Sequence, residues 1–523
     1  MKKVLIPTKL EKVAAETLKT KGYTVVQDGT TPLAELAKLH PDTEVIIVRS
    51  EKVTPEIIDA FPKLKLIVRA GAGYDTIDIK YARKKNIDVM NTPGANANAV
   101  AEEVVAMMLA VCRHLVPADI STRKGEWEKN KFMGTELTGK TVGILGMGNI
   151  GKLVAKRIQG FEVKILAYDP ILSADLAESL GVELSTVENI FQKSDFITLH
   201  IPQTPETKGM VNKRLLSLMK PGAVLINCAR AGIINEEDLR QIKKEKKIFF
   251  CNDVYPKDEP GPKSVADIAD IMLPHLGAST VEANTTAAIR AAEQTIAYFE
   301  KGVTNFVVNK GVPDGLDGRY QELAFVLSKI ARSYLGKGTA PHQIETSFYG
   351  NLGKFAKWLI APIVAGISSE FDIYLDAADA EAFLKGRGIV YNNRDVDETK
   401  KYGESMTIDL YEGTGTTIRK VSVRGTIAEN NLMLSRINDF DKMYLDPHGY
   451  TLFVEYADKP GVLGKIASLL GGKNINITDV RAPQSTDGKK AIAVIKTATE
   501  VPEQLVAEIA SSVNADNAFT FCY

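Results

Sequence analysis

Short apolar runs alternate with amphipathic stretches over the first 90 residues of the chain. These runs cover residues 4–6, 45–48, 64–68 and 87–90. Strands that alternate with helices are typical of βαβ units, whose strands form a parallel sheet. The pattern therefore predicts a first α/β lobe. Residues 97–118 follow with an apolar face, and we expect one long helix that connects this lobe to a second one.

A second series of apolar runs begins near residue 140. These runs cover residues 141–145, 163–168, 196–199, 223–226, 248–250 and 271–273. Six buried strands separated by helices predict a complete doubly wound, Rossmann-like sheet. The stretch 280–301 then predicts a helix that returns to the first lobe, which would make that lobe discontinuous.

The pattern changes near residue 305. Residues 404–412 and 416–427 alternate between apolar and polar side chains, as half-exposed antiparallel strands do. From residue 449 onward the order strand, helix, strand, strand, helix, strand indicates a ferredoxin-like module. The predicted fold class is thus α/β, with two doubly wound (Rossmann-like) lobes followed by an α+β module and a ferredoxin-like module. The expected domains are 1–97 with 284–305, then 98–283, 306–447 and 448–523.

Composition narrows the classes of function. The chain has 523 residues, and its 65 Lys and Arg balance its 65 Asp and Glu, which gives no electrostatic reason to expect nucleic acid or a membrane surface as a partner. The four cysteines are too far apart for a metal-ligand spacing, so we expect no metal. Sparse cysteines suit a reducing compartment, and no apolar stretch reaches the ~20 residues of a bilayer span. We therefore expect a cytoplasmic protein that acts on small molecules.

A glycine-rich segment follows the first strand of the second lobe. Residues 146–151 fit G-x-G-x-x-G, open a helix, and precede Asp169 at the end of the next strand. In this pattern Gly146 allows a tight turn, Gly148 lets the backbone approach a pyrophosphate, and Gly151 allows close packing of helix on strand. Asp169 would accept hydrogen bonds from the adenosine ribose and repel a 2′-phosphate. The segment therefore indicates NAD rather than NADP.

Three charged residues, Arg230, Glu259 and His275, come after strands of the second lobe. Oxidation of an alcohol by hydride transfer needs a base for the hydroxyl proton and a cation for a neighbouring carboxylate. His275 would exchange the proton, Glu259 would hydrogen-bond His275, and Arg230 would hold the carboxylate in bidentate fashion. We expect all three to face the crevice at the carboxyl ends of the strands.

Residues 1–305 resemble the D-isomer-specific 2-hydroxyacid dehydrogenases. The resemblance rests on the glycine-rich segment and on Asn-Cys-Ala-Arg at 227–230, Asp-Val-Tyr at 253–255, Glu-Pro at 259–260 and Pro-His-Leu-Gly-Ala-Ser-Thr at 274–280. The two C-terminal modules resemble the intervening and ACT domains of the family's long members. This resemblance implies NAD-dependent oxidation of 3-phospho-D-glycerate to 3-phosphonooxypyruvate, the first step of serine synthesis. It also implies a homo-tetramer with L-serine as feedback effector at the ACT domain.

The same resemblance assigns roles to individual residues. Arg230, Glu259 and His275 match the catalytic set, but the chain is one residue longer than usual between Asp253 and Glu259, so Asp258 could be the functional acid. Cofactor contacts beyond the glycines would come from Asn149, Ile150, Asp169, Cys228, Ala229, Asp253, Gly277 and Ala278. The substrate would contact Arg49, Ser50, Arg69 and Asn96. The effector would contact Tyr456, Asp458 and Asn476.

Two other functions stay open at this point. A D-2-hydroxyacid dehydrogenase that reduces glyoxylate or hydroxypyruvate would share the fold and the catalytic set. A non-catalytic, NAD-sensing corepressor-like protein would share only the fold superfamily. A panel of substrates distinguishes the first alternative from an enzyme that oxidises 3-phospho-D-glycerate. Measurable turnover excludes the second, non-catalytic alternative.

Overall fold

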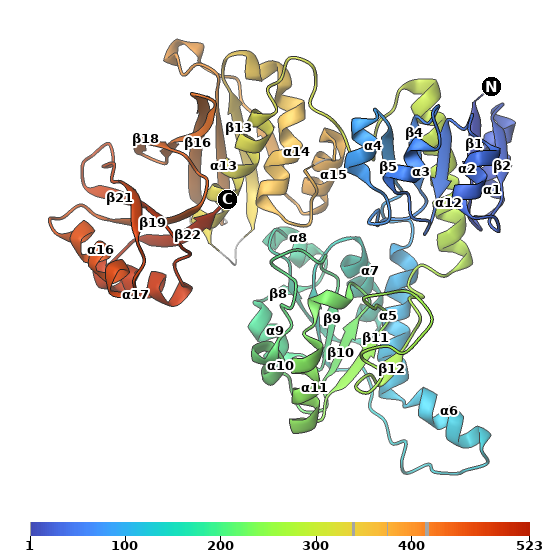
Figure 1. The fold of residues 1–523 in the computed structure, drawn as a ribbon. Helices are drawn as coiled ribbons and strands as arrows, with labels where there is room; N and C mark the ends of the chain where they lie inside the picture. Colours follow the sequence, from blue (N-terminus) through green and yellow to red (C-terminus); the bar gives the residue numbers. More distant parts are fainter. Residues whose placement is uncertain (1, 337–339, 374, 414–417) are drawn as a thin grey trace. The chain divides into compact units, whose positions relative to one another are not determined.

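The computed structural model describes residues 2–336, 340–373, 375–413 and 418–523. The chain forms two compact units, of which the first comprises Met1–Asp169 and Ala174–Lys310 and the second Pro170–Ser173 and Gly311–Tyr523. Each unit contains two sheets (Figure 1). The predicted fold class is confirmed. No helix in the described ranges is long and apolar enough to cross a membrane.

The first lobe is built on a parallel sheet of order β2-β1-β3-β4-β5. Its strands are β1 (Lys3–Ile6), β2 (Thr24–Gln27), β3 (Val45–Val48), β4 (Leu66–Arg69) and β5 (Asp88–Asn91). The connecting helices are α1 (Val13–Thr20), α2 (Leu33–Leu39), α3 (Pro55–Asp59) and α4 (Ile79–Lys84). Every residue of β3 is buried, as expected for an inner parallel strand covered on both faces. The edge strand β2 has no fully buried residue, and it was absent from the predicted strands.

Helix α12 (Val281–Lys301) packs on the first lobe. It begins at Thr280, whose hydroxyl accepts a hydrogen bond from the amide of Ala283 at 3.1 Å, and it ends at Gly302 in the left-handed region. Four alanines at helical spacing enter the core of the lobe beside α1: Ala287, Ala288, Ala291 and Ala292. The helix that follows the second lobe therefore supplies part of the first lobe's core.

The predicted single helix over residues 97–118 is wrong. The structure has α5 (Ala97–Cys112) and a separate α6 (Leu115–Arg123), with His114 between them at φ 50°. Pro117 explains the break, because it has no N–H to donate and its ring would clash with the carbonyl group of Arg113 in a continuous helix. In α6 it lies within the first turn, where proline is tolerated.

The second lobe is a seven-stranded parallel sheet of order β12-β11-β10-β9-β6-β7-β8. Its strands are β6 (Thr141–Leu145), β7 (Lys164–Tyr168), β8 (Glu183–Leu184), β9 (Phe196–Leu199), β10 (Val224–Asn227), β11 (Phe249–Asn252) and β12 (Ile271–Met272). Its helices include α7 (Asn149–Ile158), α8 (Ala174–Ser179), α9 (Val187–Lys193), α10 (Lys213–Leu218) and α11 (Glu236–Glu245). The sequence predicted all these strands except β8, which is short and exposed. The strand order reverses between β6 and β9, where a doubly wound sheet binds its ligand.

The second unit begins with a six-stranded sheet of order β14-β13-β15-β16-β17-β18. Its strands are β13 (Pro341–Phe348), β14 (Val390–Asn393), β15 (Ser405–Glu412), β16 (Arg419–Ala428), β17 (Asn431–Ile437) and β18 (Phe440–Leu445). Its helices include α13 (Arg319–Leu335), α14 (Ala356–Ile367) and α15 (Ala377–Gly386). Strands β15 and β16 pair antiparallel, as the alternating pattern predicted, and residues 414–417 between them lie outside the described residues.

The last module has the predicted element order. It consists of β19 (Tyr450–Ala457), α16 (Val462–Gly472), β20 (Ile477–Arg481), β21 (Lys490–Thr497), α17 (Glu503–Val513) and β22 (Asn517–Cys522), with sheet order β20-β21-β19-β22. One face of this sheet forms a core with α16 and α17. Phe453, Val494 and Phe521 belong instead to the large core that includes α13, so both faces of the sheet are covered (Figure 1).

Candidate active site

The glycine-rich turn between β6 and α7 has no room for side chains at two of its glycines. Gly146 has φ +93°, and a β-carbon there would collide with the carbonyl oxygen of His200. A β-carbon on Gly151 would collide with the carbonyl oxygen of Gly146. Gly148 precedes the first turn of α7, which begins at Asn149 and continues through Ile150. The first amide groups of a helix have no carbonyl partner within that helix, and the glycines before them leave no side chains in the way. Such amides can bind the phosphates of a dinucleotide.

Asp169 lies beside this turn. It follows β7, it is buried, and its Oδ2 accepts a hydrogen bond of 2.9 Å from the amide of Met147. The carboxylate is therefore held at the glycine-rich turn, where an acid can accept hydrogen bonds from ribose hydroxyls. The residues present fit NAD.

His275 and an acidic partner lie at the end of β12. The Nδ1 atom of His275 is 2.6 Å from Oδ2 of Asp258, and His275 has a left-handed backbone with φ 57°. Glu259 does not contact His275. Its carboxylate is 63% exposed and lies 3.7 Å from the ammonium group of Lys257. Of the two acids that the sequence left open as partners of His275, the structure therefore has Asp258 within hydrogen-bonding distance of the imidazole.

Asp253 fixes the backbone that follows His275. Its carboxylate is 1% exposed and accepts hydrogen bonds from the amide of Leu276 at 2.7 Å and the amide of Gly277 at 3.0 Å. Gly277 is buried and Ala278 is half-buried. The segment after β12 is thus tied to the end of β11, which limits how far the backbone next to His275 can move.

Asn227 orders the loop that carries Cys228, Ala229 and Arg230. Its side-chain oxygen accepts a hydrogen bond of 3.1 Å from the amide of Ala229, and its amide nitrogen donates one of 3.0 Å to the carbonyl oxygen of Arg230. The thiol of Cys228 is buried 3.9 Å from the sulfur of Met107, and burial raises its pKa. The buried thiol of Cys228 is thus uncharged at neutral pH, whereas the side chain of Arg230 is exposed.

Arg49 and Arg230 lie near enough to Arg69 for their charges to act on it. Arg49 follows β3, Arg69 ends β4, and Arg230 follows β10. Burial and the positive charges of Arg49 and Arg230 lower the pKa of Arg69 to about 10, which the charges of Asp75 and Glu51 partly oppose.

The side chain of Arg69 passes over Gly71, where a β-carbon would collide with the guanidinium. Its Nε atom is buried and makes no hydrogen bond, and none of the three arginines forms a salt bridge in the part of the chain that the structure describes. The cluster can therefore hold an anion.

The other two predicted substrate residues lie at the same ends of their strands. The amides of Arg49 and Ser50 both donate hydrogen bonds to Oε2 of Glu51, at 2.8 and 3.1 Å. Asn96 precedes α5, and its side chain does not cap that helix. The exposed hydroxyl of Ser50 and the amide of Asn96 thus add polar groups beyond the carboxyl ends of β3 and β5.

The predicted effector residues are spread over the last module. Tyr456 is 2% exposed and belongs to the core under α16 and α17, where burial raises its pKa. Asp458 is exposed and accepts a hydrogen bond of 2.5 Å from Nε2 of Gln484, and Asn476 is exposed before β20. Asp458 and Asn476 are accessible to a ligand, whereas Tyr456 packs in the core between the sheet and helices α16 and α17.

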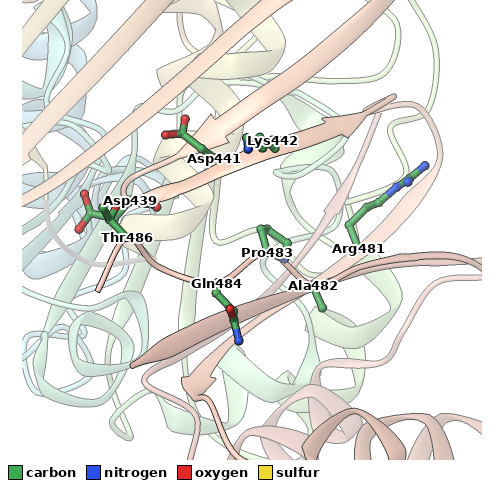
Figure 2. Close-up of a pocket in the computed structure, with 8 residues that line it drawn as sticks. All are labelled: Asp439, Asp441, Lys442, Arg481, Ala482, Pro483, Gln484 and Thr486. Atoms are coloured by element: carbon green, nitrogen blue, oxygen red, sulfur yellow. Dashed lines mark hydrogen bonds between the residues drawn. The ribbon is translucent and has the colours of Figure 1, made fainter. Parts of the chain in front are cut away.

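Figure 2 shows a pocket of about 400 Å³ in the second unit. Its lining residues come from the start of β18 with the residue before it, and from the end of β20 with the segment after it: Asp439, Asp441, Lys442, Arg481, Ala482, Pro483, Gln484 and Thr486. The predicted effector residues do not line it, although Gln484 connects it to Asp458 by the hydrogen bond above. Across the described ranges, no group of three or more His, Cys, Asp or Glu side chains is arranged to hold a metal ion.

Comparison with known proteins adds independent findings. Residues 105–277 match the family of D-isomer-specific 2-hydroxyacid dehydrogenase NAD-binding domains, and residues 450–513 match the ACT domain. D-3-phosphoglycerate dehydrogenase of Methanocaldococcus jannaschii is 33% identical, with 97% of each chain covered. The Synechocystis enzyme of the same name is 33% identical over 99% of this chain and 94% of its own.

A solved structure shares the fold. The NAD⁺-bound 3-phosphoglycerate dehydrogenase of Entamoeba histolytica is 33% identical with a TM-score of 0.50, and the match covers 60% of this chain and 99% of that one. Together with the glycine-rich turn, these findings define an NAD-dependent oxidoreductase. The chain belongs to the D-isomer-specific 2-hydroxyacid dehydrogenase family, among the long D-3-phosphoglycerate dehydrogenases that carry an ACT domain.

Proposed function

We propose that this enzyme oxidises the 2-hydroxyl group of 3-phospho-D-glycerate to give 3-phosphonooxypyruvate, the first step of serine synthesis. The observation that carries this proposal is the group formed by Arg49, Arg69 and Arg230, which has no salt bridges within the described ranges. A substrate with both a phosphate and a carboxylate needs more than one cationic anchor. The names of the full-length relatives support the same substrate.

Different residues carry out substrate binding and proton transfer. The arginines hold the anionic groups, and NAD accepts the hydride when it is bound. Asp258 engages Nδ1 of His275, so the proton taken from the substrate hydroxyl is carried on Nε2. Asp253 holds the backbone beside that imidazole, and the contact with Asp258 orients the ring.

A panel of substrates tests the proposed activity. NAD reduction is measured with 3-phosphoglycerate, D-glycerate and D-lactate, and NADH oxidation is measured with hydroxypyruvate and glyoxylate. We expect the highest kcat/KM for the phosphorylated acid. If only the unphosphorylated acids react, the enzyme is instead a glyoxylate or hydroxypyruvate reductase.

We also propose that L-serine inhibits the enzyme through the ACT domain. Asp458 is exposed between β19 and α16, and Asn476 is exposed between α16 and β20. A carboxylate and an amide are the groups that can receive the ammonium and carboxylate groups of an amino acid. Serine is titrated against NADH formation by the wild type and by Asn476→Ala. Inhibition of the wild type that weakens in this variant supports the proposal, and a wild type that serine does not inhibit contradicts it.

Assembly as a homo-tetramer in the cytoplasm is part of the proposal. Residues 115–136, here named the α6 arm, project from the second lobe (Figure 1). The arm exposes several large apolar side chains: Leu115, Val116, Ile120, Trp127 and Met133. Such a concentration is typical of a protein interface.

The proposed location in the cytoplasm is supported by the four cysteines. All four are free thiols, which suits a reducing compartment.

A further inference from the structure

Glu103 is a half-buried residue with a buried carboxyl group, which the proposed mechanism does not use. It lies on α5, and both oxygens of its carboxyl group are inaccessible to solvent and accept no hydrogen bond from a donor in the described residues. Its polar neighbour is the carboxylate of Asp253, with which it can share a hydrogen bond only when one of the two acids is protonated. Burying a carboxylate that has no donor costs free energy. Its retention beside the candidate active site therefore needs a physical reason.

The carboxyl group of Glu103 faces the backbone that follows His275. A β-carbon built on Gly277 would lie 3.2 Å from Oε2 of Glu103 and 3.4 Å from Oδ2 of Asp253. The same Asp253 accepts the hydrogen bonds from the amides of Leu276 and Gly277. Two carboxyl groups from different elements, α5 and the end of β11, thus meet at one short piece of backbone.

The surroundings of Glu103 favour its neutral form. Burial and the nearby Asp253 carboxylate raise the pKa of Glu103 from its ordinary 4.5 to about 8. From the loop after β10, the thiol of Cys228 also faces the pair, and its own pKa is raised by burial and by these two acids. The neighbours on α5, Val100 and Met107, are apolar. At neutral pH, Asp253 therefore has a protonated carboxyl group beside it.

We propose that Glu103 is a positioning residue for the cofactor: protonated, it lets Asp253 hold the 275–278 backbone at the nicotinamide site, and its ionisation weakens NADH binding. A second negative charge beside Asp253 would repel that carboxylate from its two amide donors. The inference rests on the proposed placement of Asp253 and residues 275–278 at the nicotinamide.

The test measures the affinity of the intact enzyme for NADH by fluorescence titration between about pH 6.5 and 9.5. For the wild type we expect the affinity to fall above about pH 8, approaching tenfold per pH unit because one proton is linked to binding. Glu103→Gln keeps the size and neutrality of the protonated acid. We therefore expect wild-type affinity near pH 7 and no such fall at higher pH.

The matched control is Glu102→Gln. Glu102 is the adjacent residue of α5, its side chain is 63% exposed, and it should keep the wild-type pH dependence. Glu103→Met is a second neutral variant of similar length, which is used if the glutamine variant does not fold. A fall that persists in either Glu103 variant, or that is absent from the wild type, overturns the proposal. Because NADH binding is measured without turnover, failure of the substrate assignment would appear separately, as absence of 3-phosphoglycerate oxidation.

Discussion

At the scale of single residues, the imidazole and carboxylate at the end of β12 carry the clearest chemical assignment. The contact of 2.6 Å between His275 and Asp258 fixes which nitrogen is free to exchange a proton with the substrate. Glu259 is exposed one residue later and has no contact with His275. These adjacent acids are both exposed but differ in their partner, which makes them a matched experimental pair.

Removal of the base or of its partner should lower turnover. We expect His275→Ala to reduce kcat by ~10²–10⁴. Asp258→Asn should also lower kcat, because the amide can leave the imidazole in the wrong tautomer. Glu259→Gln should retain nearly wild-type kcat and KM. A large loss in the Glu259 variant with normal turnover in the Asp258 variant would reverse the assignment of the two acids.

Glu103 should make stability depend on pH. Its folded-state pKa of about 8 lies above the ordinary 4.5, so between these pH values the folded chain holds a proton that the unfolded chain releases. The contribution of Glu103 to the free energy of unfolding therefore decreases as pH rises through this window and is constant above it.

This dependence can be measured by thermal unfolding of the cofactor-free protein. Glu103→Gln removes the titrating group, so the Tm of the variant minus that of the wild type should increase from about pH 5 to about pH 8. Glu102→Gln should give a difference that does not change with pH. A constant difference for Glu103→Gln would show that its carboxyl group titrates normally in the fold.

The site residues that follow strands could be proposed from the sequence because the carboxyl ends of parallel strands meet at one edge of a sheet. That reasoning found Arg230, Asp253 and His275. It did not find Glu103, because a glutamate on an amphipathic helix has the same local pattern whether its carboxyl group is solvated or buried. The choice between Asp258 and Glu259 also depended on the loop's three-dimensional path, which one inserted residue changes.

At the scale of elements, the glycine-rich turn between β6 and α7 determines where the cofactor phosphates can lie. Gly151 packs against the carbonyl oxygen of Gly146, so the helix start and the turn are in direct contact.

The apolar runs of the inner strands were sufficient to predict the positions of those strands. Strands β2 and β8 were missed because edge strands bury few side chains. The break at His114 was missed although Pro117 was a local indication of it.

A methyl group at Gly151 should weaken cofactor binding. Overpacking at such a contact costs ~1–3 kcal/mol, which corresponds to ~5–150-fold in affinity if it separates α7 from the turn. Gly151→Ala is compared with Gly160→Ala, where a β-carbon meets no atom within 4 Å. NADH affinity is measured by fluorescence, with a thermal melt of each variant to detect loss of fold. Equal affinities in the two variants would contradict the role of this close contact.

At the scale of the whole molecule, the α6 arm carries several exposed apolar side chains within one short stretch of chain. Trp127 is 84% exposed and Met133 79% exposed in the single chain. If the arm forms a subunit interface, a charge there must be desolvated on association. The arm could not be inferred from helix patterns, because the sequence predicted that residues 97–118 continue as one helix.

Trp127→Lys should therefore dissociate the oligomer. Its mass in solution is measured by light scattering during size-exclusion chromatography at several concentrations. Leu39→Lys is the control, since Leu39 is 67% exposed on the first lobe, far along the chain from the arm. We expect a smaller species for the Trp127 variant and unchanged mass for the control. The same mass for both variants would exclude Trp127 from the interface.

The return of α12 to the first lobe has a consequence for synthesis on the ribosome. The first lobe is translated first, but the alanines of α12 that complete its core are added only after the entire second lobe. The second lobe is thus the first to have its complete chain available for folding. Until then, the nascent sheet of β1–β5 exposes the apolar surface that α12 later covers, so chaperones that bind apolar segments should contact this lobe longest during translation.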